Sequence, residues 1–366
     1  MNFYRSLVRP VLFRFDAERI HRASLAAARA AGRNGLVRDL LTAHYAFDDP
    51  RLRISVAGIG FPNPVGLPGG YDKNGEAVEG IATAGFGFIE VGSVSLHASA
   101  GNTARPRLFR LPEDESLMVY YGVPNDGAAA VAARLATARV PVPVAINVVE
   151  TNTGKMAETD EAIEEMAESV RPFLGIAQFI VLNLNCPNSM GGMSPFEDLG
   201  KLARLLEAYR RYESLPPVFL KVKMAVDEQG VDAVLRVADP FSFIRGFIPK
   251  APEVRPYRGI RTPPSFVDRL PGSLAGPSTR RTQTALTRAW YCRIDHSRHA
   301  LIGAGGICSA EDAYERIRAG ASLVKLYTAL VYHGPGLVKE IKQGLVRLLE
   351  RDGFRTIPEA VGADCR

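Results

Sequence analysis

The chain has 366 residues, of which 46% are apolar, so it can bury the core of one large domain. Its formal net charge is +6, but no Lys/Arg block is interleaved with aromatic residues, which argues against a nucleic-acid-binding protein. The 4 cysteines lie far apart without a CxxC pair, so we expect no zinc site, no disulfide framework and no other metal site.

The first predicted element is a helical segment over residues 1–45. Between positions 1 and 38 there are eight arginines but only two acidic residues, with apolar residues between them. This pattern is typical of a basic amphipathic helix on an anionic membrane, although a solvated helical cap or a transit peptide would share parts of it. No apolar run is long enough to span a bilayer, so we expect only peripheral membrane contact.

Beyond residue 60, short apolar runs alternate with helical patterns. The eight candidate strands cover residues 64–69, 87–94, 142–149, 179–186, 218–224, 241–248, 300–305 and 322–327. Helical patterns in the gaps, for example 160–174 and 310–319, predict a parallel sheet, and eight such units favour a closed (β/α)8 TIM barrel.

We expect this barrel to cover residues 46–355, followed by a tail over residues 356–366. The rival fold is an open doubly wound sheet, which usually carries GxGxxG after its first strand; Gly66-Leu67-Pro68-Gly69-Gly70 lacks that spacing. Residues 249–277 are rich in proline and arginine and are predicted to form a long loop.

The fourth strand ends in Asn183-Leu184-Asn185-Cys186-Pro187-Asn188-Ser189. Active sites of such barrels lie at the carboxyl ends of the strands, so Cys186 is a candidate general base. With an ordinary pKa of about 8.5, a few per cent of such a thiol is thiolate near neutrality. The alternative is a buried cysteine that acts as a small hydrophobe, but the flanking amides would then be wasted in an apolar core.

A phosphate site is predicted after the seventh and eighth strands. Gly305-Gly306 leads into a helix that Ser309 and Asp312 begin in capping-box spacing, and Tyr327-Thr328 adds hydroxyl groups one strand later. Phosphate sites in these barrels favour these two loops. Further polar residues at the strand ends could bind a ring rich in donors and acceptors: Lys73, Asn147, Asn183 and either Lys221 or Lys223.

Together these motifs resemble the dihydroorotate dehydrogenase family over nearly the whole chain. The resemblance rests on Asn63-Pro64-Val65-Gly66-Leu67, Tyr71-Asp72-Lys73-Asn74-Gly75-Glu76-Ala77, Gly101-Asn102, residues 105–114, Cys186-Pro187-Asn188, Gly305-Gly306, residues 317–324 and Tyr327-Thr328. The stretch over residues 13–21 resembles the extension of the membrane-associated, quinone-using class, in which two short helices form a tunnel to the flavin.

The resemblance implies an enzyme of pyrimidine biosynthesis that binds FMN and oxidises dihydroorotate to orotate, with Cys186 taking a proton, FMN N5 a hydride and a quinone the electrons. It implies a peripheral position on the cytoplasmic side of the membrane. The FMN-binding residues carried over are Gly70, Lys73, Ser93, Asn147, Asn183, Lys221, Gly276, Gly306, Tyr327 and Thr328. Lys73, Asn183 and Asn188 would bind substrate, and His21 and Arg107 would line the quinone tunnel.

Three positions depart from the family pattern. Cys186 stands where the quinone class normally has serine, Val119 where the family has a substrate-binding asparagine, and Pro249-Lys250 where a Thr-Asn pair is expected. These departures leave open a different cyclic amide or enone substrate, or a non-catalytic flavin-binding relative. Retention of Cys186 together with Asn183 and Asn188 favours an enzyme.

Overall fold

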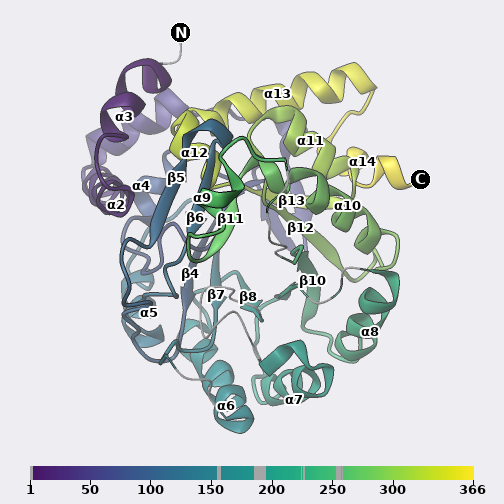
Figure 1. The fold of residues 1–366 in the computed structure, drawn as a ribbon. Coiled ribbons are helices and arrows are strands. Elements are labelled where there is room, and N and C mark those ends of the chain that lie inside the picture. Colours follow the sequence, from purple (N-terminus) through teal and green to yellow (C-terminus); the bar gives the residue numbers. More distant parts are fainter. Residues whose placement is uncertain are drawn as a thin grey trace.

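The structure is a computed structural model that describes residues 3–154, 158–184, 195–223, 225, 227–252, 257 and 259–366. Eight parallel strands form a closed barrel, so the predicted (β/α)8 fold is confirmed (Figure 1). The barrel strands are β3 (Val65–Leu67), β4 (Phe88–Val94), β7 (Val144–Val148), β8 (Phe179–Asn183), β9 (Val218–Val222), β10 (Ile244–Pro249), β12 (Ala300–Ala304) and β13 (Ala321–Lys325). Each one overlaps the strand predicted for it, in the predicted order.

Helices surround the barrel, as the alternating pattern predicts (Figure 1). They are α4 (Val78–Ala82), α5 (Ala128–Leu135), α6 (Thr159–Val170), α7 (Leu199–Tyr209), α8 (Glu228–Ala238), α10 (Arg280–Tyr291), α11 (Ala310–Arg318), α12 (Thr328–His333) and α13 (Leu337–Asp352). Residues 356–366 form α14 (Ile357–Ala360) and the short 3-10 helix Ala363–Cys365.

Side-chain caps satisfy one of the first N–H groups of α7, α8 and α11. Asp198 accepts from the N–H of Lys201 at the start of α7, and Asp227 accepts from Gly230 at the start of α8. Each helix then buries one apolar stripe against the sheet, while strands β7 and β8 are buried along their whole length. The core therefore lies between the barrel and its helices.

A β-hairpin packs at the amino-terminal end of the barrel. It consists of β1 (Ile54–Val56) and β2 (Ile59–Phe61). The Phe61 ring lies 5.6 Å from that of Phe88, at the start of β4, and 6.1 Å from that of Phe179, at the start of β8. Because aromatic rings fill this end, open space for a ligand is left at the carboxyl end.

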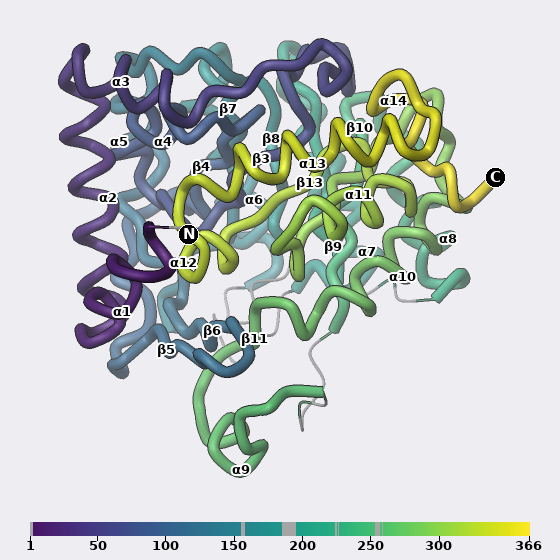
Figure 2. The backbone as a smooth tube through the Cα atoms, turned by 90° about the horizontal axis from the view of Figure 1, so that it is seen from above, coloured from purple at the N-terminus to yellow at the C-terminus, as the bar shows by residue number. Residues whose placement is uncertain are grey.

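A second, three-stranded sheet lies at that carboxyl end. It pairs β5 (Leu108–Leu111), β6 (Ser116–Val119) and β11 (Ser273–Ala275) antiparallel, and Figure 2 shows it with α9 (Pro264–Val267) at one end of the molecule. The predicted long loop over residues 249–277 is therefore wrong in part, since it contains α9 and β11. Ser273 is paired with Val119, which places this region against the β5–β6 hairpin.

The amino-terminal segment is helical, as predicted. It contains a π-helix (Tyr4–Val8), α1 (Arg9–Leu12), α2 (Ala17–Arg33) and α3 (Gly35–Tyr45). Helix α2 runs along one side of the molecule beside α4, so close that a Cβ on Gly80 would lie 1.8 Å from the carbonyl oxygen of Ala28 (Figure 2). Within the described part of the chain, no helix is long and apolar enough to cross a membrane.

Candidate functional site

A cavity of about 310 Å³ opens at the carboxyl end of the barrel, between the strand ends and the small sheet. Its lining includes nine of the ten residues predicted to bind the cofactor: Gly70, Lys73, Ser93, Asn183, Lys221, Gly276, Gly306, Tyr327 and Thr328. The tenth, Asn147, lies behind Gly69, which does line the cavity. Cys186 and Asn188 lie outside the described residues.

Glycines form one wall of the cavity. Gly305 and Gly306 have φ angles of +84° and +73°, and a Cβ on Gly306 would lie 2.6 Å from the backbone nitrogen of Arg280. Helix α11 begins next to them: Ser309 accepts from the N–H of Asp312, and the Asp312 carboxylate accepts from the N–H of Cys308 at 2.9 Å. The close backbone and the helix start together suit a phosphate group.

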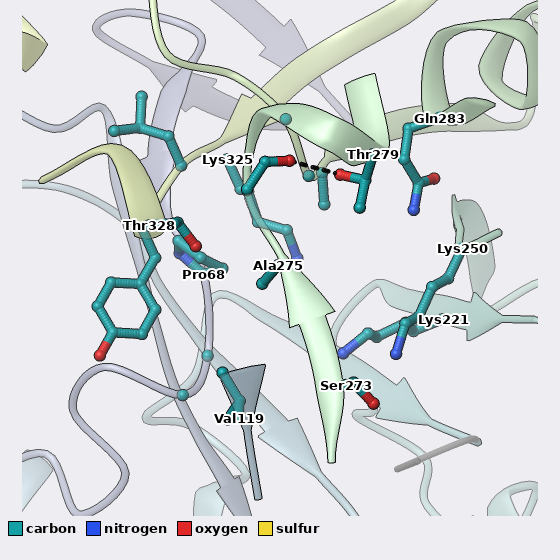
Figure 3. A pocket seen from close by; sticks show the side chains of 18 of the residues that line it. Pro68, Val119, Lys221, Lys250, Ser273, Ala275, Thr279, Gln283, Lys325 and Thr328 are labelled. Atoms are coloured by element: carbon teal, nitrogen blue, oxygen red, sulfur yellow. Dashed lines mark hydrogen bonds between the residues drawn. The ribbon is translucent and has the colours of Figure 1, made fainter. Parts of the chain in front are cut away.

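Four lysines reach the cavity: Lys73, Lys221, Lys250 and Lys325. Lys221 and Lys250 come from the neighbouring strands β9 and β10 and the loop that follows, and both extend toward the pocket in Figure 3. Lys223, the other candidate on β9, instead lies 4.0 Å from Glu197 and is absent from the lining. The described lining residues include no Asp or Glu, so the cavity suits anionic ligands.

Two buried amides complete the site. Asn183, at the end of β8, donates through Nδ2 to the hydroxyl of Ser93 at 3.1 Å. The Oδ1 atoms of Asn183 and Asn147 are buried and have no hydrogen-bond partner in the part of the chain that the structure describes. A buried acceptor left unpaired costs about 1–3 kcal/mol, so this wall favours a ligand with N–H groups. A flavin with its phosphate fits both this wall and the glycine wall.

Sequence reasoning missed an ion pair in the barrel interior. The Lys325 ammonium donates to Oε2 of Glu90 at 2.5 Å, and the two side chains are only 2% and 1% exposed. Burial by itself would raise the pKa of Glu90, but the charge and hydrogen bond of Lys325 outweigh it and hold that pKa below its ordinary value. The sequence does carry a signal for this ion pair, because each of two apolar strands contains one charged residue.

A second cavity, of about 390 Å³, lies between the amino-terminal helices and the barrel. Its lining is mostly apolar and includes Leu12, Phe13, Ala31, Leu41 and Leu330. Leu108 and Tyr327 line both cavities, so the two spaces share a wall.

His21, which the resemblance assigns to a quinone tunnel, lines this second cavity. Burial and the nearby charge of Lys73 lower the pKa of His21 to about 3, so the imidazole is neutral at physiological pH. Its Nδ1 lies 3.4 Å from the hydroxyl of Tyr327. Arg107, the other predicted tunnel residue, is absent from the lining; it is buried and pairs with Glu18 at 2.6 Å. Arg110, which was not predicted, does line the cavity.

Comparison with known proteins shows which family this chain resembles. A family model described as "Dihydroorotate dehydrogenase" matches residues 51–349. A "Dihydroorotate dehydrogenase (quinone)" of Roseiflexus sp. (strain RS-1) is 38% identical over 367 residues, which cover 98% of this chain and 97% of that protein. A protein of the same name from Halobacterium salinarum is 36% identical over 359 residues, covering 98% and 99%.

The fold has a matching solved structure as well. The crystal structure of a ligand-free dihydroorotate dehydrogenase from Eimeria tenella superposes with a TM-score of 0.79 at 26% sequence identity. The match covers 91% of this chain and 99% of that one.

Proposed function

Because the chain belongs to the dihydroorotate dehydrogenase family, we propose that it oxidises dihydroorotate to orotate with FMN as its flavin and a quinone as electron acceptor. The family is flavin-dependent, and the chain is an oxidoreductase of that family. FMN is proposed as the particular flavin because a single glycine-rich phosphate wall adjoins the amides of the cavity.

The observation that carries this proposal is the pair of adjoining cavities. One is lined by lysines and amides and suits an anionic substrate beside a flavin; the other is mostly apolar and suits a quinone. Tyr327 and Leu108 line both cavities, so ligands in the two spaces would be neighbours across a shared wall. The residues that line the first cavity would hold FMN, which would supply a hydride acceptor and a carrier of electrons to the quinone.

The chain's own residues would bind and orient the two ligands. Lys73 is held by the carbonyl of Gly70 at 2.6 Å and lies 4.2 Å from the centre of the Tyr121 ring, so its ammonium has a fixed place beside the ligand. Lys221 adds a second positive charge next to Asn183 in the strand register. These charges would favour an anionic substrate and negative charge on a reduced cofactor.

The catalytic base and one substrate-binding asparagine are proposed from the sequence alone. Cys186 would remove a proton from dihydroorotate, and Asn188 would bind the ring together with Asn183 and Lys73. Both Cys186 and Asn188 follow β8, whose end already carries the cavity-lining Asn183.

We further propose that residues 1–45 bind the cytoplasmic face of a membrane peripherally, with the barrel over residues 46–355 beside it. In support, Leu7, Val11, Leu36 and Leu40 are between 53% and 71% exposed on this segment. Arginines accompany them, which suits anionic lipid headgroups. The membrane would also be the source of the quinone.

Purified protein tests the proposal directly. It should be yellow and release FMN, and not FAD, on denaturation. Anaerobic dihydroorotate should bleach the flavin, and a short-chain quinone should restore the colour. Colourless protein that cannot be reconstituted with FMN contradicts the cofactor; a flavin that dihydroorotate leaves oxidised contradicts the substrate and favours another cyclic amide or enone.

A further inference from the structure

The buried ion pair of Lys325 and Glu90 joins the cavity lining to the barrel interior. Lys325 itself lines the cavity. A Cβ on Gly69, another lining residue, would lie 2.9 Å from Oε1 of Glu90 and 3.2 Å from Cβ of Asn147. Glu90 and Asn147 therefore lie against the backbone of Gly69, at the wall of the cavity.

Glu90 determines which way the amide of Asn147 is turned. Its Oε1 accepts a hydrogen bond of 2.6 Å from Nδ2 of Asn147. A carboxylate can only accept hydrogen bonds, so the NH2 group of Asn147 must face it and Oδ1 must face away. That Oδ1 is buried and without a partner among the described residues.

Lys325 keeps Glu90 in the form that can only accept. Burial would raise the pKa of Glu90, whereas the charge and hydrogen bond of Lys325, followed by the charge of Lys221, lower it. Without the positive charge of Lys325, the buried carboxyl group of Glu90 would be protonated more easily and could donate to Oδ1 of Asn147. The amide would then turn, and an N–H group would replace the acceptor.

We propose that Lys325 and Glu90 are positioning residues, which fix Asn147 so that its Oδ1 is presented as an acceptor to an N–H group of the bound flavin ring. This inference rests on the proposed function, because the ring is that of FMN. It assigns the ion pair a role in cofactor recognition, and it predicts that the pair acts through the amide and not through contact with substrate.

The test is the dissociation constant of FMN, measured by fluorescence quenching with apoprotein from pH 6 to 9. Lys325→Met should bind FMN about tenfold more weakly than wild type at the lower pH, the size of one lost hydrogen bond. Because Glu90 loses its proton as the pH rises, the affinity of this variant should recover toward high pH. Wild type should show no such dependence, and neither should Lys201→Met on α7, away from the cavity.

Two charge-free double variants isolate the amide. Lys325→Met with Glu90→Gln can donate to Asn147 as a protonated carboxyl does, so at every pH it should bind FMN about as weakly as Lys325→Met does at pH 6. Lys325→Met with Glu90→Leu removes the acceptor for Asn147 altogether and should also bind FMN about tenfold more weakly than wild type. Neither leaves a buried charge unpaired, so both remain informative if the single variant does not fold.

Wild-type FMN affinity in either double variant overturns the inference, as does a pH-independent wild-type affinity in Lys325→Met. Either result leaves the proposed function standing. Wild-type protein that binds no FMN overturns both the proposed cofactor and the role of the ion pair.

Discussion

The strongest prediction about a single residue concerns Cys186 as the general base. Cys186→Ala should leave FMN binding intact and slow flavin reduction by dihydroorotate by about 10²-fold or more, the usual contribution of a general base. Cys186→Ser should retain partial activity with its pH profile moved upward, because a hydroxyl is a weaker acid than a thiol. Stopped-flow bleaching of the flavin measures both, and an unchanged rate in the alanine variant would return Cys186 to the role of a buried hydrophobe.

Two further residues bear on the substrate. Val119 and Lys250 both line the barrel cavity, as Figure 3 shows, so the two departures from the family pattern meet at one site. An apolar Val119 leaves a polar edge of dihydroorotate without a partner, at a cost of about 1–3 kcal/mol. Lys250 could offset this by a charge-assisted hydrogen bond to the substrate carboxylate.

We therefore predict that dihydroorotate binds weakly and that Val119→Asn with Lys250→Asn strengthens its binding. Flavin reduction at a series of dihydroorotate concentrations gives the half-saturating concentration of each protein. Saturation of the wild type in the micromolar range, with no gain in the double variant, would show that these positions have not altered specificity.

At the level of elements, Glu18 ties helix α2 to the segment that leads into β5. Its carboxylate is buried and pairs with Arg107 at 2.6 Å and with Arg105 at 2.5 Å. Burial would raise the pKa of Glu18, but hydrogen bonds from Arg107 and Arg105 lower it from 4.5 to about 2. A lowered pKa in the folded state means that the stabilisation is complete above pH 4.5 and is lost as the pH falls from 4.5 toward 2.

Glu18→Gln should accordingly lower the free energy of unfolding by about 3 kcal/mol at neutral pH, since it leaves buried Arg107 without its charge partner. The difference in the free energy of unfolding between Glu18→Gln and wild type should narrow as the pH falls below 4.5. Melting temperatures across this range measure it. Asp39→Asn, which neutralises an exposed carboxylate on α3, is the matched control and should leave the melting temperature unchanged. A stability difference between Glu18→Gln and wild type that stays constant with pH would contradict the lowered pKa of Glu18.

The exposed faces of the amino-terminal helices give the second prediction at this level. Leu36 and Leu40 lie one turn apart on α3 and are 71% and 62% exposed. Each leucine buried in a membrane contributes about 1.5–3 kcal/mol, so Leu36→Gln with Leu40→Gln should weaken binding to anionic liposomes more than tenfold. Phe266→Gln, on exposed α9, should bind like wild type.

Anaerobic flavin reduction should be unaffected in the Leu36/Leu40 double variant and in Phe266→Gln. Removal of residues 1–38 should abolish liposome binding and quinone reduction, while the truncated protein should still bind its flavin and stay yellow. Undiminished liposome binding after either change would leave this segment as only a helical cap.

The same elements show what the sequence could and could not predict. The eight barrel strands were found because each buried run ends in a polar or glycine-rich turn. The β5–β6–β11 sheet was missed because Val119 and Ser273 are paired across 154 positions of the chain, and no local pattern reveals such a partner. Lys325 and Glu90 were missed for the same reason, since their contact joins two strands that are far apart in sequence.

At the scale of the whole molecule, the two cavities separate the two halves of the proposed reaction. Dihydroorotate would enter at the barrel mouth, whereas the quinone would enter beneath the amino-terminal helices, and Tyr327 lies between them. The neutral imidazole of His21 beside Tyr327 adds no charge to the apolar side. A change in one cavity should therefore affect one half-reaction and leave the other intact.

Ala31 on α2 tests this separation, because it lines the apolar cavity while its neighbour Ala30 faces the outside of the same helix. Ala31→Trp fills space that a quinone would occupy and should raise the quinone KM at least tenfold, while anaerobic bleaching by dihydroorotate proceeds at the wild-type rate. Ala30→Trp, an equal change in size on the same helix, should leave both half-reactions unchanged. The melting temperature of each variant controls for overpacking, which costs about 1–3 kcal/mol. If Ala31→Trp slowed both half-reactions equally, or neither, the apolar cavity would not be the quinone's route and the electrons would have to leave through the barrel mouth.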